Sequence, residues 1–172
     1  QFDDRALPDQ IHSAAENTGF SLSRLVLEIT ERALIDNTGQ ALSIAQQLKT
    51  LGVRLSLDDF GTGYSSLRHL QSLPFDELKV DASFIREMSD TRESRKIVAA
   101  VIGLGHSLGL PTVAEGVEAK AQADMLLWLG CDRGQGWLYG PPIPACDLPS
   151  FLSARPLALP ASPESSNDDR LP

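Results

Sequence analysis

Charged and amide side chains recur in this sequence at the ends of short apolar runs. The apolar runs are typical of buried β-strands, and the polar residues that close them are Glu28, Asp58, Asp59, Lys79, Asp81, Glu115 and Gln135. In parallel α/β folds the carboxyl ends of the strands share one edge of the sheet, where ligands and catalytic groups gather. One such acid is explained equally well as a helix cap. A set drawn from five successive strands predicts a functional site.

Carboxylates brought together at one edge repel one another unless a cation neutralises them. Hard oxygen ligands of this kind suit Mg²⁺ or Mn²⁺. Successive strand side chains point apart, so Asp59 must turn at the strand's end to reach the site of Asp58, or one of them bridges two ions. Two metal ions about 3.5–4 Å apart would clamp the attacking and leaving oxygens of a phosphodiester. Lys79 fits three roles there: ion pairing, phosphate contact, or holding the attacking water.

The elements that must position these residues follow from hydrophobic periodicity. Strands are expected near residues 25–29, 53–57, 78–80, 112–114 and 131–135, and helices near 11–18, 41–51, 67–70, 90–108 and 121–129. The helix near 90–108 is expected to start at Asp90 with Glu93 as capping-box partner, and to bury Ile97, Val101, Leu104 and Leu108. Alternation of strand and helix predicts an α/β fold with a parallel sheet. A doubly wound sheet and a (β/α)8 barrel both fit.

Composition narrows the class of protein. The 172 residues carry a net charge of -8, whereas a surface that binds double-stranded nucleic acid is normally basic. No run of about 18 apolar residues and no signal peptide is visible, so membrane contact is not expected from this segment. Two cysteines are no disulfide framework, which favours a reduced, cytoplasmic location. Residues 1–152 are interpreted as one domain, and 153–172, rich in Pro, Ser and Asp, as a disordered tail.

Five segments in order resemble the motifs of EAL-domain cyclic di-GMP phosphodiesterases. They are residues 27–31 (LEITE), 57–67 (LDDFGTGYSSL), 73–81 (LPFDELKVD), 113–118 (VAEGVE) and 130–136 (GCDRGQG). The resemblance implies a (β/α)8 TIM-like barrel, here partial because its first strands are missing. It also implies Mg²⁺- or Mn²⁺-dependent hydrolysis of cyclic di-GMP to linear pGpG in bacterial second-messenger signalling.

The resemblance also implies a role for each acid at the strand ends. Glu28 corresponds to a ligand of the first metal, Asp58 to the bridging ligand, and Asp59 to a ligand of the second metal. Glu115 corresponds to the acid that ligates the second metal and positions the nucleophilic water. Lys79 matches the lysine beside that water and is a candidate for its activation.

Other positions correspond to supporting residues. Glu118, a catalytic candidate, and Gln135 resemble groups around the water and the ligand, and Asp81 belongs to the same supporting set. Glu31 matches the glutamate that steadies the loop of residues 58–66, which the family ties to metal binding and dimerisation. A homodimer through the loop after Asp59 is therefore expected.

The sequence departs from the family pattern at its start. The Glu-Ala-Leu motif and the metal-binding Asn of a following strand are absent, which predicts a chain that begins about 80–100 residues into a domain of about 250. The first metal then lacks two ligands, so this chain is expected to be impaired in activity. A non-catalytic cyclic di-GMP receptor or regulatory module is the alternative, and another metal-dependent barrel lyase or hydrolase a third. Upstream sensory or GGDEF-type domains, and a membrane anchor in the parent protein, are compatible with such a piece.

Overall fold

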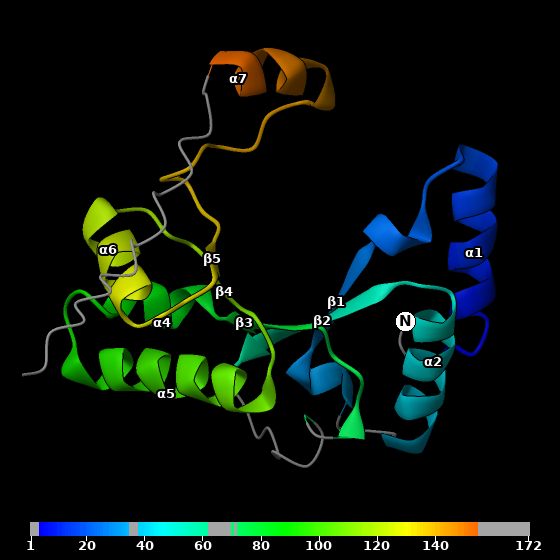
Figure 1. The fold of residues 1–172 in the computed structure, drawn as a ribbon, viewed down its shortest axis with the longest axis horizontal. Helices are drawn as coiled ribbons and strands as arrows, with labels where there is room; N and C mark the ends of the chain where they lie inside the picture. The colour runs from blue at the N-terminus through cyan, green and yellow to red at the C-terminus, as the bar shows by residue number, and fades with distance from the viewer. Residues whose placement is uncertain (1–3, 35–37, 62–69, 71, 155–172) are drawn as a thin grey trace, which may run out of the picture. The chain divides into compact units, whose positions relative to one another are not determined.

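The computed structural model (Figure 1) describes residues 4–34, 38–61, 70 and 72–154. The chain divides into two compact units, Gln1–Gly140 and Pro141–Pro172. The elements of the first unit are α1 (Leu7–Thr18), η1 (Leu22–Arg24), β1 (Val26–Thr30), η2 (Glu31–Leu34), α2 (Thr38–Thr50), β2 (Arg54–Phe60), β3 (Glu77–Val80), α4 (Ala82–Glu87), α5 (Arg92–Leu108), β4 (Thr112–Ala114), α6 (Lys120–Trp128) and β5 (Arg133–Gly134). The second unit contains η3 (Ala145–Asp147) and α7 (Leu148–Ala154).

Some sequence predictions concern residues that the structure does not describe. Residues 67–69 of the helix expected near 67–70 and the tail from 155 onward lie outside the described residues, as does most of the loop that follows Asp59. None of the helices that the structure describes is long and apolar enough to span a membrane.

The five strands form one parallel sheet in the order β1-β2-β3-β4-β5. Spatial order therefore equals chain order, without the reversal that defines a doubly wound sheet. Of the two folds that periodicity left open, this order is that of a barrel wall. It also places the carboxyl ends of all five strands along one edge, which we call the carboxyl edge; the opposite one is the amino edge.

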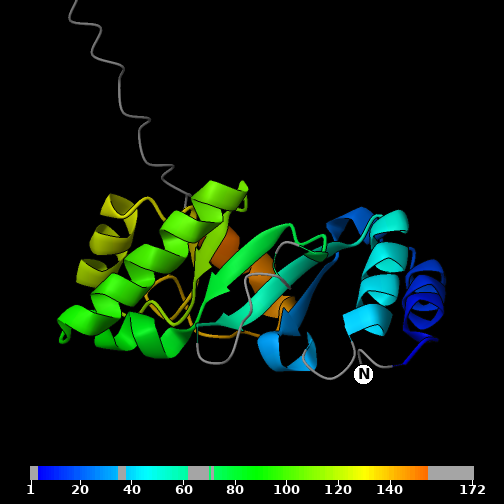
Figure 2. The same cartoon turned by 90° about the horizontal axis from the view of Figure 1, so that it is seen from below.

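Helices cover one face of this sheet. In Figures 1 and 2, α2 runs alongside β2, while α5 runs alongside β3 and β4. Alternate strand residues such as Leu55, Leu57 and Leu78 are fully buried, as are Leu48 of α2 and Ile102 of α5. Removing these side chains from water is the main stabilising contribution to this unit.

The predicted start and buried face of α5 need correction. The N-cap is Thr91, whose side chain accepts a hydrogen bond from Ser94 N at 3.2 Å, and not Asp90. Ile97 is 37% exposed, whereas Val98 and Ile102 are buried. The predicted face is correct at Val101, which is buried, and at Leu104 and Leu108, which pack against the core. It is wrong at Ile97, because Ile97 and Val98 are adjacent apolar residues and sequence spacing alone does not choose between them.

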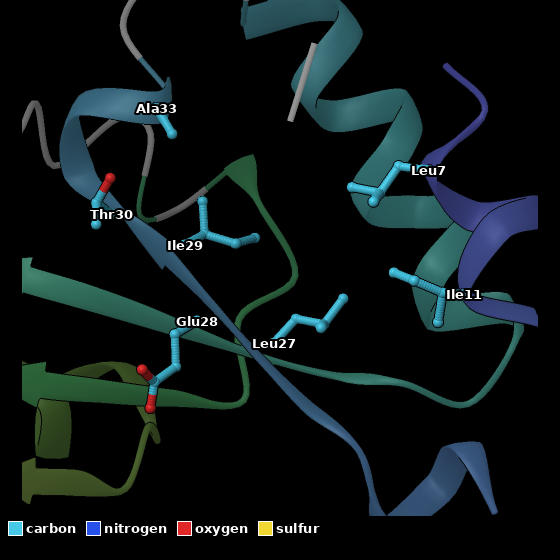
Figure 3. A pocket seen from close by; sticks show the side chains of 7 residues that line it. All are labelled: Leu7, Ile11, Leu27, Glu28, Ile29, Thr30 and Ala33. Atoms are coloured by element: carbon cyan, nitrogen blue, oxygen red, sulfur yellow. The ribbon is translucent and has the colours of Figure 1, made fainter. Parts of the chain in front are cut away.

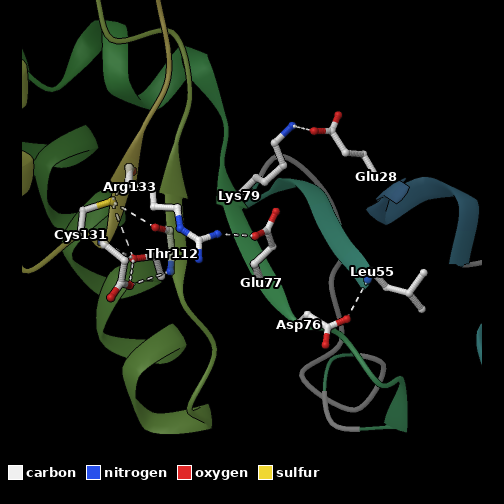
Figure 4. Close-up of polar contacts among 9 residues, drawn as sticks. Glu28, Leu55, Asp76, Glu77, Lys79, Thr112, Cys131 and Arg133 are labelled. Atoms are coloured by element: carbon white, nitrogen blue, oxygen red, sulfur yellow. Dashed lines mark hydrogen bonds and ion pairs between the residues drawn. The ribbon is translucent and has the colours of Figure 1, made fainter. Parts of the chain in front are cut away.

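Aspartates fasten the amino edge. Asp76 immediately precedes β3, and its Oδ2 accepts a hydrogen bond from Leu55 N of β2 at 2.8 Å, while Lys49 Nζ lies 2.5 Å from its Oδ1. Asp132 immediately precedes β5, and its Oδ2 accepts from Thr112 N of β4 at 2.7 Å. Each aspartate thus holds the start of the preceding strand. Figure 4 shows the contact between Asp76 and Leu55.

Candidate active site

Lys79 lies at the centre of the charged groups of the carboxyl edge. Its side chain is only 4% exposed, and its Nζ lies 2.7 Å from Glu28 Oε1 and 3.3 Å from Asp58 Oδ1. The same ammonium contacts Glu115 Oε1. These acids come from β1, β2 and the end of β4, so strands far apart in sequence bring them together around one lysine. Figure 4 shows the pair with Glu28.

The backbone at Asp58 and Asp59 turns both acids toward the same site. The register between β2 and β3 shifts between Leu57 and Phe60, as in a β-bulge, and Asp59 has a left-handed φ of 57°. Positive φ is uncommon outside glycine, although Asp tolerates it better than β-branched residues do. The sequence had left two explanations for these neighbouring acids. The left-handed conformation of Asp59, one residue before the end of β2, is the turn that the first explanation requires.

A cluster of oxygens results. Asp58, Asp59 and Glu115 each offer one carboxylate oxygen, and these oxygens lie within 4.8 Å of one another. All three side chains are partly buried. Carboxylate oxygens are the ligands that Mg²⁺ and Mn²⁺ prefer, so the donor set fits a hard divalent cation.

Among the charged groups described at the site, carboxylates outnumber cations. Burial, followed by repulsion from Asp58, raises the pKa of Asp59. Burial likewise raises the pKa of Glu115, although Lys79 opposes this shift. Burial alone would lower the pKa of Lys79, but its hydrogen bonds to Glu115 and Glu28 raise it above the ordinary value. One ammonium shared by several carboxylates therefore stays charged without neutralising them, and a bound cation would relieve the remaining repulsion.

Glu115 is held from a second side. Gln135 Nε2 donates to Glu115 Oε1 at 2.7 Å, and Gln135 N donates to Ala114 O at 2.8 Å. The glycine after each residue permits a close approach. A Cβ at Gly116, which has a φ of 66°, would lie 2.7 Å from Ala82 Cβ, and one at Gly136 would lie 2.3 Å from backbone atoms of Val117. The local sequence thus fixes where the two side chains start.

Asp81 has a structural contact in this region. Its carboxylate caps α4, because Oδ1 accepts a hydrogen bond from Ser83 N at 2.8 Å and also contacts the Ser83 hydroxyl. Burial alone would raise the pKa of Asp81, but the hydrogen bonds from Ser83 lower it. Asp81 also hydrogen-bonds to Asp59, so it borders the cluster from the α4 side.

Two predicted residues stand apart from the cluster. The Glu118 side chain is exposed, and its described contact is through its backbone, where Glu118 N donates to Gln122 Oε1 at 2.8 Å. Glu31 begins η2 and is only 4% exposed, and neither of its carboxylate oxygens has a hydrogen-bond partner among the described residues. The loop that Glu31 is expected to steady lies mostly outside those residues.

A separate pocket adjoins the site and is largely apolar. It is lined by Leu7, Ile11, Leu27, Glu28, Ile29, Thr30 and Ala33. Figure 3 shows the Glu28 carboxylate on the other side of β1 from α1 and α2. Glu28 is therefore one of the carboxylates that surround Lys79, although it also lines the pocket.

Several polar contacts were missed from the sequence. They are the amino-edge contacts of Asp76 and Asp132, and an ion pair in which Arg133 Nη1 lies 2.8 Å from Glu77 Oε2. Each joins residues at least 20 positions apart. The available signal was an acid immediately before a strand, at Asp76 and Asp132, where it can reach the start of a neighbouring strand.

Comparisons with known proteins agree with this geometry. The family model described as "EAL domain" matches residues 1–142. The bifunctional diguanylate cyclase/cyclic di-GMP phosphodiesterase MucR of Pseudomonas aeruginosa is 44% identical over 148 residues, which are 86% of this chain and 22% of MucR. The cyclic di-GMP phosphodiesterase NbdA of the same species is 43% identical over 149 residues, 87% of this chain and 19% of NbdA. The chain thus spans about a fifth of these relatives.

Solved structures share the fold. The MucR phosphodiesterase in complex with c-di-GMP superposes with a TM-score of 0.82 at 44% identity, over 86% of this chain and 60% of that one. The manganese/cyclic di-GMP complex of Klebsiella pneumoniae BlrP1 gives 0.74 at 30% identity, over 81% of this chain and 36% of that one. The five parallel strands are therefore part of a TIM-barrel arrangement, and the chain belongs to the EAL domain family.

Proposed function

We propose that this chain is part of a metal-dependent phosphodiesterase domain that hydrolyses cyclic di-GMP to linear pGpG. The observation that carries the proposal is the oxygen cluster of Asp58, Asp59 and Glu115 around Lys79. MucR and NbdA are named as cyclic di-GMP phosphodiesterases, and BlrP1 was solved with manganese and the dinucleotide. The donor set of this chain fits the same kind of ion.

In this proposal Asp58, Asp59 and Glu115 hold Mg²⁺ or Mn²⁺, and Glu28 contributes from β1. When bound, such ions lower the pKa of a water molecule and neutralise charge that develops on the phosphate. Lys79 contacts Glu28, Asp58 and Glu115, so in this proposal it orients the carboxylates, attracts the phosphate and helps to hold the attacking water.

Gln135 and Glu118 have supporting roles in this proposal. Gln135 donates to Glu115 Oε1, which leaves Glu115 Oε2 available to an ion or a water molecule. Glu118 lies three residues after Glu115 with an exposed side chain, and so is available to a bound ligand. A homodimer through the segment after Asp59 remains part of the proposal.

The test is Asp58→Asn in the full-length protein, with pGpG production measured in Mg²⁺ and in Mn²⁺. We expect turnover to fall by about 100-fold or more, because the substitution removes a charged oxygen ligand without changing side-chain size. Asp124→Asn is the matched control, since Asp124 pairs only with the exposed Lys120 of α6 in the contacts described. Unchanged pGpG production by the Asp58 variant refutes the assignment.

A receptor that binds without cleaving is distinguished by calorimetry. Cyclic di-GMP is titrated into the full-length protein in Ca²⁺, and turnover is then measured in Mg²⁺. Binding followed by Mg²⁺-dependent turnover supports the phosphodiesterase. Binding without turnover in either Mg²⁺ or Mn²⁺ replaces it with a receptor.

A further inference from the structure

We infer that Arg133 and Glu77 form a brace across β4 that positions Gln135 against Glu115, an inference that rests on the proposed function only for its consequence in catalysis. Arg133 Nη1 donates to Glu77 Oε2 at 2.8 Å. The two residues belong to β5 and β3, which are not neighbours but flank β4. Figure 4 shows the arginine reaching across to the glutamate.

The register explains why this contact is made. Lys79 of β3, Val113 of β4 and Arg133 of β5 lie side by side across the sheet. Glu77 stands two residues before Lys79, so both side chains project from the same face of β3. Two strand spacings separate β3 from β5, about 10 Å, which an extended arginine and a glutamate span together. The ion pair therefore passes over Val113, which is only 7% exposed.

β5 has a short ladder with further contacts at its ends: Asp132 accepts a hydrogen bond from Thr112 N before the strand, and after it Gln135 N donates to Ala114 O while Gln135 O accepts from Val117 N. The strand pairs with β4 through only two residue pairs, Val113 with Arg133 and Ala114 with Gly134. A ladder of two residue pairs defines the register weakly by itself, and a slip of one residue would turn the side chains of β5 to the other face. Gln135 follows directly and stands two residues after Arg133. The Arg133–Glu77 contact adds a side-chain attachment to the strand from whose end Gln135 donates to Glu115, beside the local backbone contacts of Gln135.

The same pair also separates charges. Glu77 is 13% exposed and stands on the face that carries Lys79. Arg133 supplies this carboxylate with its own cation, so the Lys79 ammonium is left to Glu28, Asp58 and Glu115. Because the Arg133 side chain is 53% exposed, solvent screens the pair and its contribution to global stability is small. Arg133 and Glu77 are positioning residues, whose effect is expected locally at Gln135.

Amide hydrogen exchange on the full chain tests the brace without reference to catalysis. Gln135 N donates to Ala114 O, so its exchange rate reports the attachment of this segment. Leu55 N, held by Asp76 at the amino edge, is the internal reference for global unfolding. In Arg133→Gln and in Glu77→Gln we expect exchange at Gln135 to accelerate about 5-fold or more while Leu55 changes less than about 2-fold. Unchanged exchange at Gln135, or equal acceleration at both amides, overturns the inference.

The double variant sharpens the test. Either single substitution breaks the same contact, so Arg133→Gln combined with Glu77→Gln should accelerate exchange at Gln135 no more than one substitution alone. Effects that multiply would mean that the two side chains act separately and would overturn the brace. Lys120→Gln is the matched control, because it breaks the exposed pair with Asp124 on α6 and should leave Gln135 unchanged.

Turnover of cyclic di-GMP by the full-length protein gives the catalytic consequence. Arg133→Gln should lower kcat about 5-fold with KM within about 2-fold, because a displaced Gln135 no longer orients Glu115. A wild-type protein without turnover refutes the proposed function, but the exchange experiment still decides on the brace. Local acceleration at Gln135 with an unchanged kcat keeps the brace and overturns its catalytic role.

Discussion

Carboxylates at the two edges of the sheet have different roles. At the amino edge Asp76 and Asp132 each accept a backbone N–H at the start of a strand, and Asp76 is matched by Lys49. All of these contacts join groups of the protein and need no bound ion or ligand. Their acids are therefore part of what stabilises the fold.

At the carboxyl edge the acids exceed the cations that face them. Glu28, Asp58 and Glu115 share Lys79, and burial and mutual repulsion raise the pKa of Asp59. A backbone N–H alone does not mark an acid as structural, because Asp58 also accepts one from Asp59. The acids of the carboxyl edge differ from Asp76 in that several of them share one lysine, which leaves them able to hold a further cation.

The largest effect on stability is expected for Lys79→Met. Without metal, the variant leaves several partly buried carboxylates facing one another, so the free energy of unfolding should fall by about 3 kcal/mol. Urea unfolding measures this loss. Mn²⁺ should restore stability more in the variant than in the wild type, because it supplies the missing positive charge. Equal Mn²⁺ effects in both proteins would contradict the shared-lysine interpretation.

A smaller loss is expected at the amino edge. Asp76→Asn removes the ion pair with Lys49 and weakens the hydrogen bond from Leu55 N, so the free energy of unfolding should fall by about 1.5 kcal/mol. The gain in stability on adding Mn²⁺ should match that of the wild type. If the Mn²⁺ effect disappears in this variant, the division between the two edges is wrong.

Asp58→Asn, the same type of substitution at the carboxyl edge, should lower the free energy of unfolding by less than Asp76→Asn does. Asp58→Asn loses a contact with Lys79 but also relieves repulsion with Asp59 and Glu115. In the absence of metal the free energy of unfolding should therefore change by less than about 0.5 kcal/mol. Urea unfolding of the two Asp→Asn variants in parallel makes the comparison. A loss as large as that of Asp76→Asn would show that Asp58 is chiefly structural.

The smallest effect is the pH dependence of the metal-free chain. Burial raises the pKa of Asp59 and of Glu115, so the folded state binds protons more readily than the unfolded state. Their penalty is fully present above the raised pKa values and is lost as the pH falls. Stability should therefore increase as the pH falls from neutral into the acidic range in which these two carboxylates bind protons. Urea unfolding at several pH values should show this trend reduced in Asp59→Asn, and an unchanged trend would contradict the cause given.

The sequence predicted the convergence at the carboxyl edge but not the amino-edge contacts. Glu28, Asp58 and Glu115 could be found because position at the end of an apolar run implies a common edge once the strands are parallel. That inference needs no knowledge of which strands are neighbours. In the structure Glu28, Asp58 and Glu115 lie around Lys79.

Contacts between particular side chains require the register, which one sequence does not contain. The Arg133–Glu77 pair depends on β5 lying two strands from β3, and the Asp76 contact depends on where β2 begins. The six-residue α4 was missed because it is too short to show a period. The start of α5 was misplaced by one residue because Asp90 and Thr91 are both good caps, and only the backbone chooses between them.

The left-handed backbone at Asp59 limits which residues can replace it by mutation. The conformation excludes β-branched residues and admits Asn and Gly, which differ from Asp by one nucleotide in the genetic code. Among the single-nucleotide changes of an Asp codon, the left-handed backbone therefore favours Asn and Gly over Val, and both remove the carboxylate. Descendants of this gene could lose that charge in a single step while keeping the shape of the protein.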